Sequence, residues 1–139
     1  MNLILGVLTM VVCMVTQAII ASLAVQYYGR FEERISRGSA LTSLAVMVGV
    51  MVLLLVGNFA QIILWAGLFL FLGEFEQFVD AVYHSAVNFA TLGYGDIVMS
   101  EAHRMLGPLE AINGVLMIGV STAVLMSAIQ DAMEKRSQR

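Results

Sequence analysis

Residues 91–96 read Thr-Leu-Gly-Tyr-Gly-Asp, and they lie between two long apolar segments that carry very few charges. Irregular backbone at membrane depth is tolerated only where it is buried in protein or lines a water-filled pathway. Gly93 and Gly95 alternate with larger residues, and glycine adopts positive φ without steric cost, so successive carbonyl groups can point the same way. Such carbonyls, repeated around an axis, can replace the water around a dehydrated cation.

The composition places the chain in a membrane. Of its 139 residues, 60% are apolar and 12% are charged, whereas soluble domains carry about 25% charged residues. The length suits one membrane unit and leaves no room for a soluble nucleotide-binding or ligand-binding domain. The single cysteine, Cys13, cannot form an intrachain disulfide and has no neighbours that would complete a metal site.

Three apolar segments are long enough to cross a bilayer, which takes about 20 residues. We therefore expect an all-α membrane protein with three transmembrane helices and one short re-entrant helix. A cleaved signal peptide is the alternative for the first segment, although no basic residue precedes its apolar run. The predicted order is a transmembrane helix at 1–29, a loop at 30–40, a second helix at 41–72, a re-entrant helix at 75–90, the irregular stretch at 91–96, a third helix at 104–132 and a tail at 133–139.

The basic residues predict the orientation. Six of the seven fall in two clusters, one in the loop and one in the tail: Arg30, Arg34 and Arg37, then Lys135, Arg136 and Arg139. Loops rich in Lys and Arg stay in the cytoplasm. We therefore expect a multi-pass protein of the cell (inner) membrane, with the loop and the C-terminus cytoplasmic and the N-terminus outside. The re-entrant segment then enters from outside.

The stretch from Phe78 to Asp96 resembles the pore helix and selectivity filter of small prokaryotic potassium channels of the two-helix, pore-loop family, here with one extra N-terminal helix. The resemblance covers roughly residues 55–132. It implies a pore domain at 41–132, in which 41–72 is the outer helix, 75–90 the pore helix, 91–96 the filter and 104–132 the inner helix. By the same resemblance the ion-coordinating filter comprises Thr91, Leu92, Gly93, Tyr94 and Gly95, with K⁺ bound by the carbonyls of the first four.

The resemblance also assigns residues that support the filter: Asp96, Tyr83, His84, Val87 and Asn88. Several depart from the family pattern. Tyr83 and His84 stand where some relatives have two Trp residues, Val87 where some have Glu, and Asn88 where Thr is usual. For His84 two interpretations stay open: a neutral, hydrogen-bonded residue packed on Tyr94 of a neighbouring chain, or a sensor of external pH.

The third helix carries further candidates. By the same resemblance, Gly114 falls on the family's hinge glycine and Gly119 on its second small position, so both are candidates for a gating hinge; small residues also serve close helix packing, and the sequence does not separate these roles. Ser121, Thr122 and Met126 are expected to line the cavity below the filter. Among the polar residues, we expect Glu110 to bond the back of the pore helix near Ser85 or Asn88, and Asn58 and Gln61 to form interhelical hydrogen bonds.

One chain supplies one such loop, whereas a closed ring of carbonyls needs several, so the resemblance and cyclic symmetry imply a homotetramer. The expected function is passive, potassium-selective conduction, with potassium ions and lipid as partners, no cofactor, no nucleic acid and no enzymatic activity. Acidic residues on the external side would concentrate cations there: Glu74, Glu76, Asp80, Asp96 and Glu101. Alternatives are a weakly selective cation channel, a coupled transporter subunit and a non-conducting regulatory subunit.

Overall fold

Three long helices run side by side in the computed structural model, which describes residues 2–37 and 40–137. They are α1 (Asn2–Arg30), α3 (Ala40–Phe71) and α5 (Leu106–Ser137). Each contains a span long and apolar enough to cross a membrane, as expected, and no strand occurs in the described ranges. Residues 1, 38–39 and 138–139, which belong to the predicted first helix, loop and tail, lie outside the described residues.

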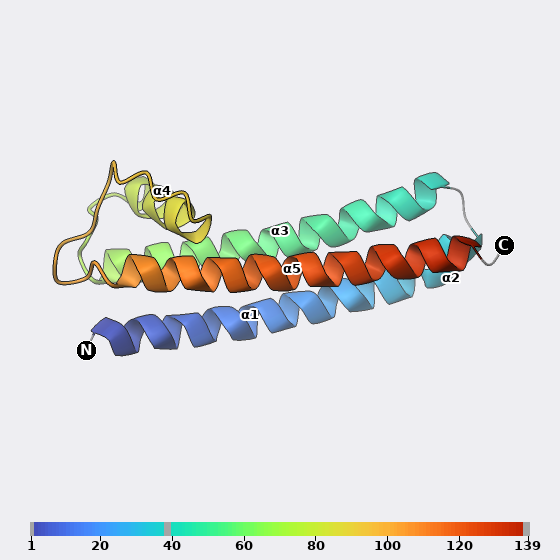
Figure 1. The fold of residues 1–139 in the computed structure, drawn as a ribbon, viewed down its shortest axis with the longest axis horizontal. Coiled ribbons are helices and arrows are strands. Elements are labelled where there is room, and N and C mark those ends of the chain that lie inside the picture. The colour runs from blue at the N-terminus through green and yellow to red at the C-terminus, as the bar shows by residue number, and fades with distance from the viewer. Residues whose placement is uncertain (1, 38–39, 138–139) are drawn as a thin grey trace.

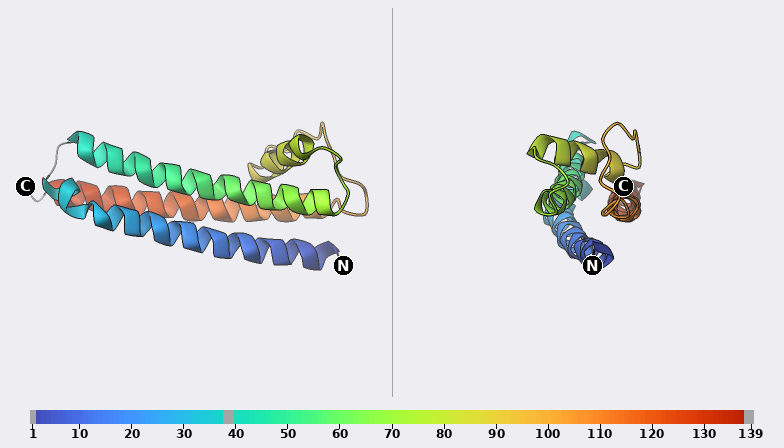
Figure 2. Two further views of the ribbon diagram at one scale, coloured as in Figure 1. Left: turned by 180° about the vertical axis from the view of Figure 1, so that it is seen from behind. Right: turned by 90° about the vertical axis from the view of Figure 1, so that its left-hand side faces the viewer.

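The short helix α4 (Phe78–Phe89) lies across one end of this bundle. It packs on α3 and α5, and the end-on view in Figure 2 places it on the side of the bundle away from the N-terminal end of α1. The N-terminus lies at the same end of the bundle as α4, and the C-terminus lies at the other (Figure 1). The basic residues of 30–37 and of the end of α5 therefore lie at the end of the bundle opposite to α4.

The helix boundaries differ from the expected ones for local reasons. The α3 helix ends at Phe71 because Gly73, with φ of 73°, reverses the chain, and the Glu74 amide donates back to the Phe69 carbonyl over 3.0 Å. The turn consumes residues that were expected in the pore helix, which therefore begins at Phe78 instead of 75. After residue 96, a loop delays the start of α5 to Leu106, where 104 was expected.

The segments expected as a loop at 30–40 and a tail at 133–139 are largely helical in the described residues, so this expectation was wrong. The loop contains a short helix, α2 (Glu32–Arg37), and α5 continues into the tail as far as Ser137. Lys135 holds these two segments together, since its ammonium group pairs with Glu32 over 2.8 Å and with Asp131 one turn earlier on α5. Burial of Ile35 against Val46 and Ala132 anchors α2 further.

A buried chain of polar side chains joins the three long helices near their middle. Gln61 donates to the Gln17 oxygen over 2.7 Å, Gln17 donates to Ser121 over 2.8 Å, and Ser121 donates to Asn58 over 3.4 Å. The expected interhelical role of Asn58 and Gln61 is thus confirmed, with α1 as an additional partner. Interhelical hydrogen bonds in membranes contribute about 0.6–2 kcal/mol each, so the network fixes how α1 sits against α3 and α5.

Candidate ion-conduction site

Along the stretch 91–96, residues with positive φ alternate with residues whose φ is not positive. Thr91, Gly93 and Gly95 have φ of 58°, 57° and 71°, whereas the residues between them do not have positive φ. The expected positive φ at the two glycines is therefore present. At Thr91 it is unusual, because a β-branched residue rarely adopts this region and single residues held there cluster at functional sites.

The end of α4 holds the start of this stretch through its own carbonyl groups. The Thr91 amide donates to the Asn88 carbonyl over 2.8 Å, and the Leu92 amide donates to the Val87 carbonyl over 2.9 Å. Among the backbone and side-chain hydrogen bonds found in the described residues, none is accepted by the carbonyl of any residue from 91 to 95. The carbonyl oxygens of residues 91–95 are thus left without protein donors, while the amides of Thr91, Leu92 and Gly93 donate to carbonyls of α4.

Asp96 ends the stretch 91–96 and is tied to α4. The Tyr83 hydroxyl donates to one Asp96 carboxylate oxygen over 2.6 Å, and the Ile97 amide donates to the other over 3.1 Å. The hydrogen bond from Tyr83 lowers the pKa of Asp96, and the same bond raises the pKa of Tyr83. Tyr83 therefore joins α4 to the last residue of the stretch 91–96.

His84 is a buried residue with both ring nitrogens engaged. Its Nδ1 lies 3.0 Å from the Ile97 carbonyl oxygen, and its Nε2 lies 2.8 Å from the Asn88 amide nitrogen. A carbonyl only accepts and an amide NH₂ only donates, so the ring is neutral with its proton on Nδ1. Burial lowers the pKa of His84. The geometry agrees with the neutral, hydrogen-bonded interpretation, although the ring packs on Phe69 and Phe75 of its own chain.

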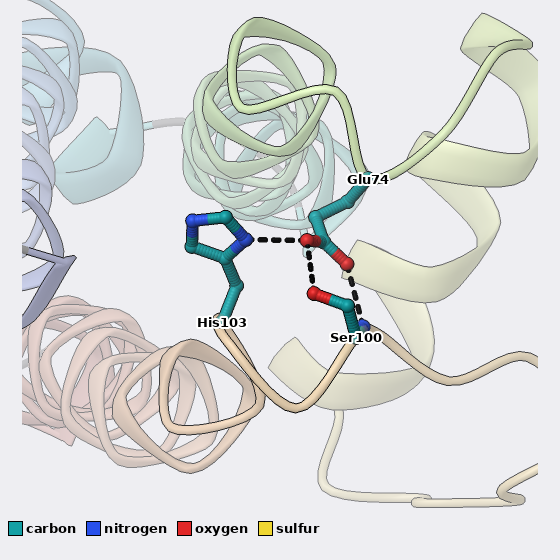
Figure 3. A network of polar contacts seen from close by, with 3 residues as sticks. All are labelled: Glu74, Ser100 and His103. Atoms are coloured by element: carbon teal, nitrogen blue, oxygen red, sulfur yellow. Dashed lines mark hydrogen bonds and ion pairs between the residues drawn. The ribbon is translucent and has the colours of Figure 1, made fainter.

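A third support, which the sequence analysis missed, lies behind the loop that follows the filter. Figure 3 shows Glu74 accepting hydrogen bonds from the backbone amide and the hydroxyl of Ser100, each 2.6 Å long, and from Nδ1 of His103. Burial would raise the pKa of the Glu74 carboxyl, but the bonds from Ser100 and His103 together lower it. The only sequence signal was an acidic residue directly after the helix-ending Gly73.

Of the acidic residues expected around an external vestibule, Glu74 thus faces inward, with a side chain only 6% exposed. The other acidic residues lie at the same end of the helix bundle. Glu76, Asp96 and Glu101 are exposed there, and Asp80 is half-buried. The expectation that Glu74 adds charge to an external vestibule is therefore wrong. Its carboxylate instead joins the end of α3 to the loop before α5.

The remaining supports lie on the inner side of α4. Val87 is buried, and its backbone carbonyl accepts hydrogen bonds from the amides of Leu92 and Gly93. Asn88 accepts the Thr91 amide through its backbone carbonyl, and its side chain donates to His84. Glu110 of α5 contacts the Ser85 hydroxyl of α4, so the expected bond between Glu110 and the back of the pore helix is confirmed.

The inner-helix candidates divide between two faces. Gly114 packs on the end of α4, since a Cβ built there would lie 2.8 Å from the carbonyl carbon of Phe89, whereas a Cβ at Gly119 would have no neighbour within 4 Å in the chain. Thr122 and Met126 are exposed on the single chain, as a pore-facing position requires. Ser121 is not: its hydroxyl is buried between Gln17 and Asn58, so the expectation that it lines the cavity is wrong.

Comparison with known protein families gives one match. A family described as "Ion channel" matches residues 51–131, from the middle of α3 through α4 and the filter stretch into α5. The match leaves out α1, which is the extra helix. No curated protein and no solved structure matches the chain. Because the matched region covers more than half of the chain and contains the whole re-entrant unit, the protein belongs to the ion channel family built from two membrane helices and a pore loop.

Proposed function

We propose that the protein is a potassium-selective channel in which four copies of Thr91–Asp96 surround one pore. The observation that carries the proposal is the row of carbonyls at 91–95, which accept no hydrogen bond in the described part of the chain. Backbone carbonyls at membrane depth need a partner, and rings of them replace the hydration shell of K⁺ in carbonyl-lined filters. The coordinating groups are the carbonyls of Thr91, Leu92, Gly93 and Tyr94.

The exposure of the filter side chains supports assembly. Leu92 is 54% exposed and Tyr94 is 65% exposed on the single chain. These side chains lie beside a backbone that must be sealed from lipid, so neighbouring copies of the same loop are the natural cover. A cyclic homotetramer closes the ring of carbonyls and covers the four copies of these side chains at once.

In this channel, conduction is passive, and the ions move along their gradient without a cofactor or a catalytic step. The basic loop and tail support an orientation in the cell (inner) membrane with the C-terminus facing the cytoplasm and the N-terminus and filter entrance outside. Exposed Glu76, Asp96 and Glu101 then lie at the external entrance, where their charge raises the local cation concentration.

The test is ion flux from liposomes that contain the purified protein alone. We expect potassium flux that barium blocks, with little sodium flux, and a mass that corresponds to four chains. Alanine at Gly93 should abolish selective flux, because positive φ costs an L-residue about 1–2 kcal/mol. Alanine at Gly67, which has no neighbour within 4 Å, is the matched control and should conduct normally.

Other results would refute the proposal in specific ways. Equal sodium and potassium flux would make the protein a weakly selective cation channel. An absence of flux from a correctly assembled protein would favour a non-conducting regulatory subunit. Flux that requires the gradient of a second ion would favour a coupled transporter.

A further inference from the structure

A carboxylic acid is buried behind the pore helix, in the part of α5 that crosses the membrane. Glu110 has no exposed surface, and it lies within the span Leu106–Lys135. The ion pairs found in the described residues join Glu74 to His103 and Lys135 to Glu32 and Asp131, so none of them involves Glu110. An ionised carboxylate without a partner is costly to bury, and at membrane depth the cost is higher still.

The protons around Ser85 can be counted. The Ser85 oxygen lies 2.8 Å from the Ile62 carbonyl of α3 and also contacts the Oε1 atom of Glu110. Two separate hydrogen bonds across these contacts need two protons, one between each pair of oxygens. A hydroxyl supplies one proton and a backbone carbonyl supplies none, so the Ser85 proton goes to Ile62 and the second proton must come from Glu110.

We infer that Glu110 is a protonated carboxylic acid that donates a hydrogen bond to Ser85 and thereby positions the pore helix. Its other oxygen, Oε2, is buried, and although the Asn88 side chain lies nearby, no donor forms a hydrogen bond of good geometry with it among the described residues; this suits the carbonyl oxygen of a neutral acid better than a charged oxygen. The titratable group that faces it from α1 is the Cys13 thiol, and Ser85 is its partner from α4.

This bond acts on the filter through a short path. Ser85 lies two residues before Val87, whose carbonyl accepts the Leu92 amide of the filter over 2.9 Å. One turn beyond Glu110, Gly114 of α5 packs on the backbone of Phe89. The same face of α5 therefore holds α4 at two points, and Glu110 is a positioning residue for the carbonyls that anchor the filter.

Infrared spectroscopy of the protein in liposomes tests the protonation state directly. We expect a carbonyl stretching band of a protonated carboxylic acid at pH 7 that persists at pH 9 and disappears in Glu110→Gln. Glu101→Gln removes an exposed carboxylate and is the matched control, which should keep the band. Loss of only ionised-carboxylate bands in Glu110→Gln would overturn the inference. In Ser85→Ala the band should remain but shift in frequency, since the acid loses its acceptor; an unshifted band would also overturn it.

The positioning role rests on the proposed potassium pore and needs a second readout. Glu110→Gln, whose amide still donates, should keep the ratio of potassium to sodium flux within about twofold. Glu110→Ala should lower that ratio at least tenfold. Equal loss in both variants would refute positioning by a donated bond. If the unmodified protein carries no flux, the proposed function fails, but the infrared result still decides whether Glu110 is protonated.

Discussion

Replacing Gly114 with alanine tests how the inner helix α5 docks on the pore helix α4. The added Cβ would lie 2.8 Å from the carbonyl carbon and 3.0 Å from the Cα of Phe89, and it would lie closer still to the Phe89 oxygen. Ordinary contacts are about 3.5–4.0 Å, and backbone atoms cannot turn aside as a flexible side chain can. The two helices must therefore separate, which moves the end of α4 and the filter that it anchors.

The magnitude follows from two opposing effects. Overpacking typically costs about 1–3 kcal/mol, whereas alanine in place of glycine within a helix gains about 0.5–1 kcal/mol. Gly119→Ala is the matched control on the same helix, because a Cβ there has no neighbour within 4 Å in the chain. Gly119→Ala gains the same helix propensity as Gly114→Ala but creates no clash. The difference in free energy of unfolding between the two variants should thus equal the overpacking cost, about 1–3 kcal/mol.

The assay is reversible unfolding of the purified protein in detergent micelles, with the potassium-to-sodium flux ratio measured in parallel. Gly114→Ala should be less stable than Gly119→Ala and should lose selectivity. A Gly114→Ala protein at least as stable as Gly119→Ala would refute the docking argument. Normal selectivity in Gly114→Ala with defective opening in both variants would favour the alternative role of the two glycines as a gating hinge.

Three further predictions concern the outer mouth and the extra helix. Burial lowers the pKa of His84. The contribution of His84 to stability is therefore complete above the unfolded pKa of about 6.5, and it is lost as the pH falls from there through the lower pKa of the folded state. Thermal unfolding measured against pH should show this loss in the unmodified protein and not in His84→Gln. Glu74→Gln should speed amide hydrogen exchange at Ser100, whose amide the carboxylate accepts over 2.6 Å; an unchanged rate would mean that the loop is held by other contacts. Gln17→Leu removes the two hydrogen bonds by which Gln17 joins α1 to α3 and α5 and should lower the free energy of unfolding by about 1–2 kcal/mol; equal stability would show that other contacts, such as the Tyr28–Asp131 hydrogen bond and apolar packing, suffice to hold α1.

Much of the site was predictable because it depends on short-range sequence. Glycines at 93 and 95 predict positive φ, and both have it. The bond between Glu110 and the pore helix was also predictable, since a lone acid within an apolar span needs a polar partner and few were available. Positive φ at Thr91 was not predictable, because the residue type argues against it and only the hydrogen bonds at the end of α4 impose it.

The sequence by itself determined that the chain is a three-span membrane protein with a re-entrant loop, because apolar length and charge position act locally along the chain. Only the tertiary structure decided which polar groups meet. It turned Glu74 from a vestibule charge into a support for the loop after the filter, and Ser121 from a pore-lining residue into a link between α1 and α3. The physical reason is that one helix can present a polar side chain to any of several neighbours. The partner of such a side chain depends on how the helices are rotated and how they cross. Tertiary packing determines this geometry, and the local sequence does not.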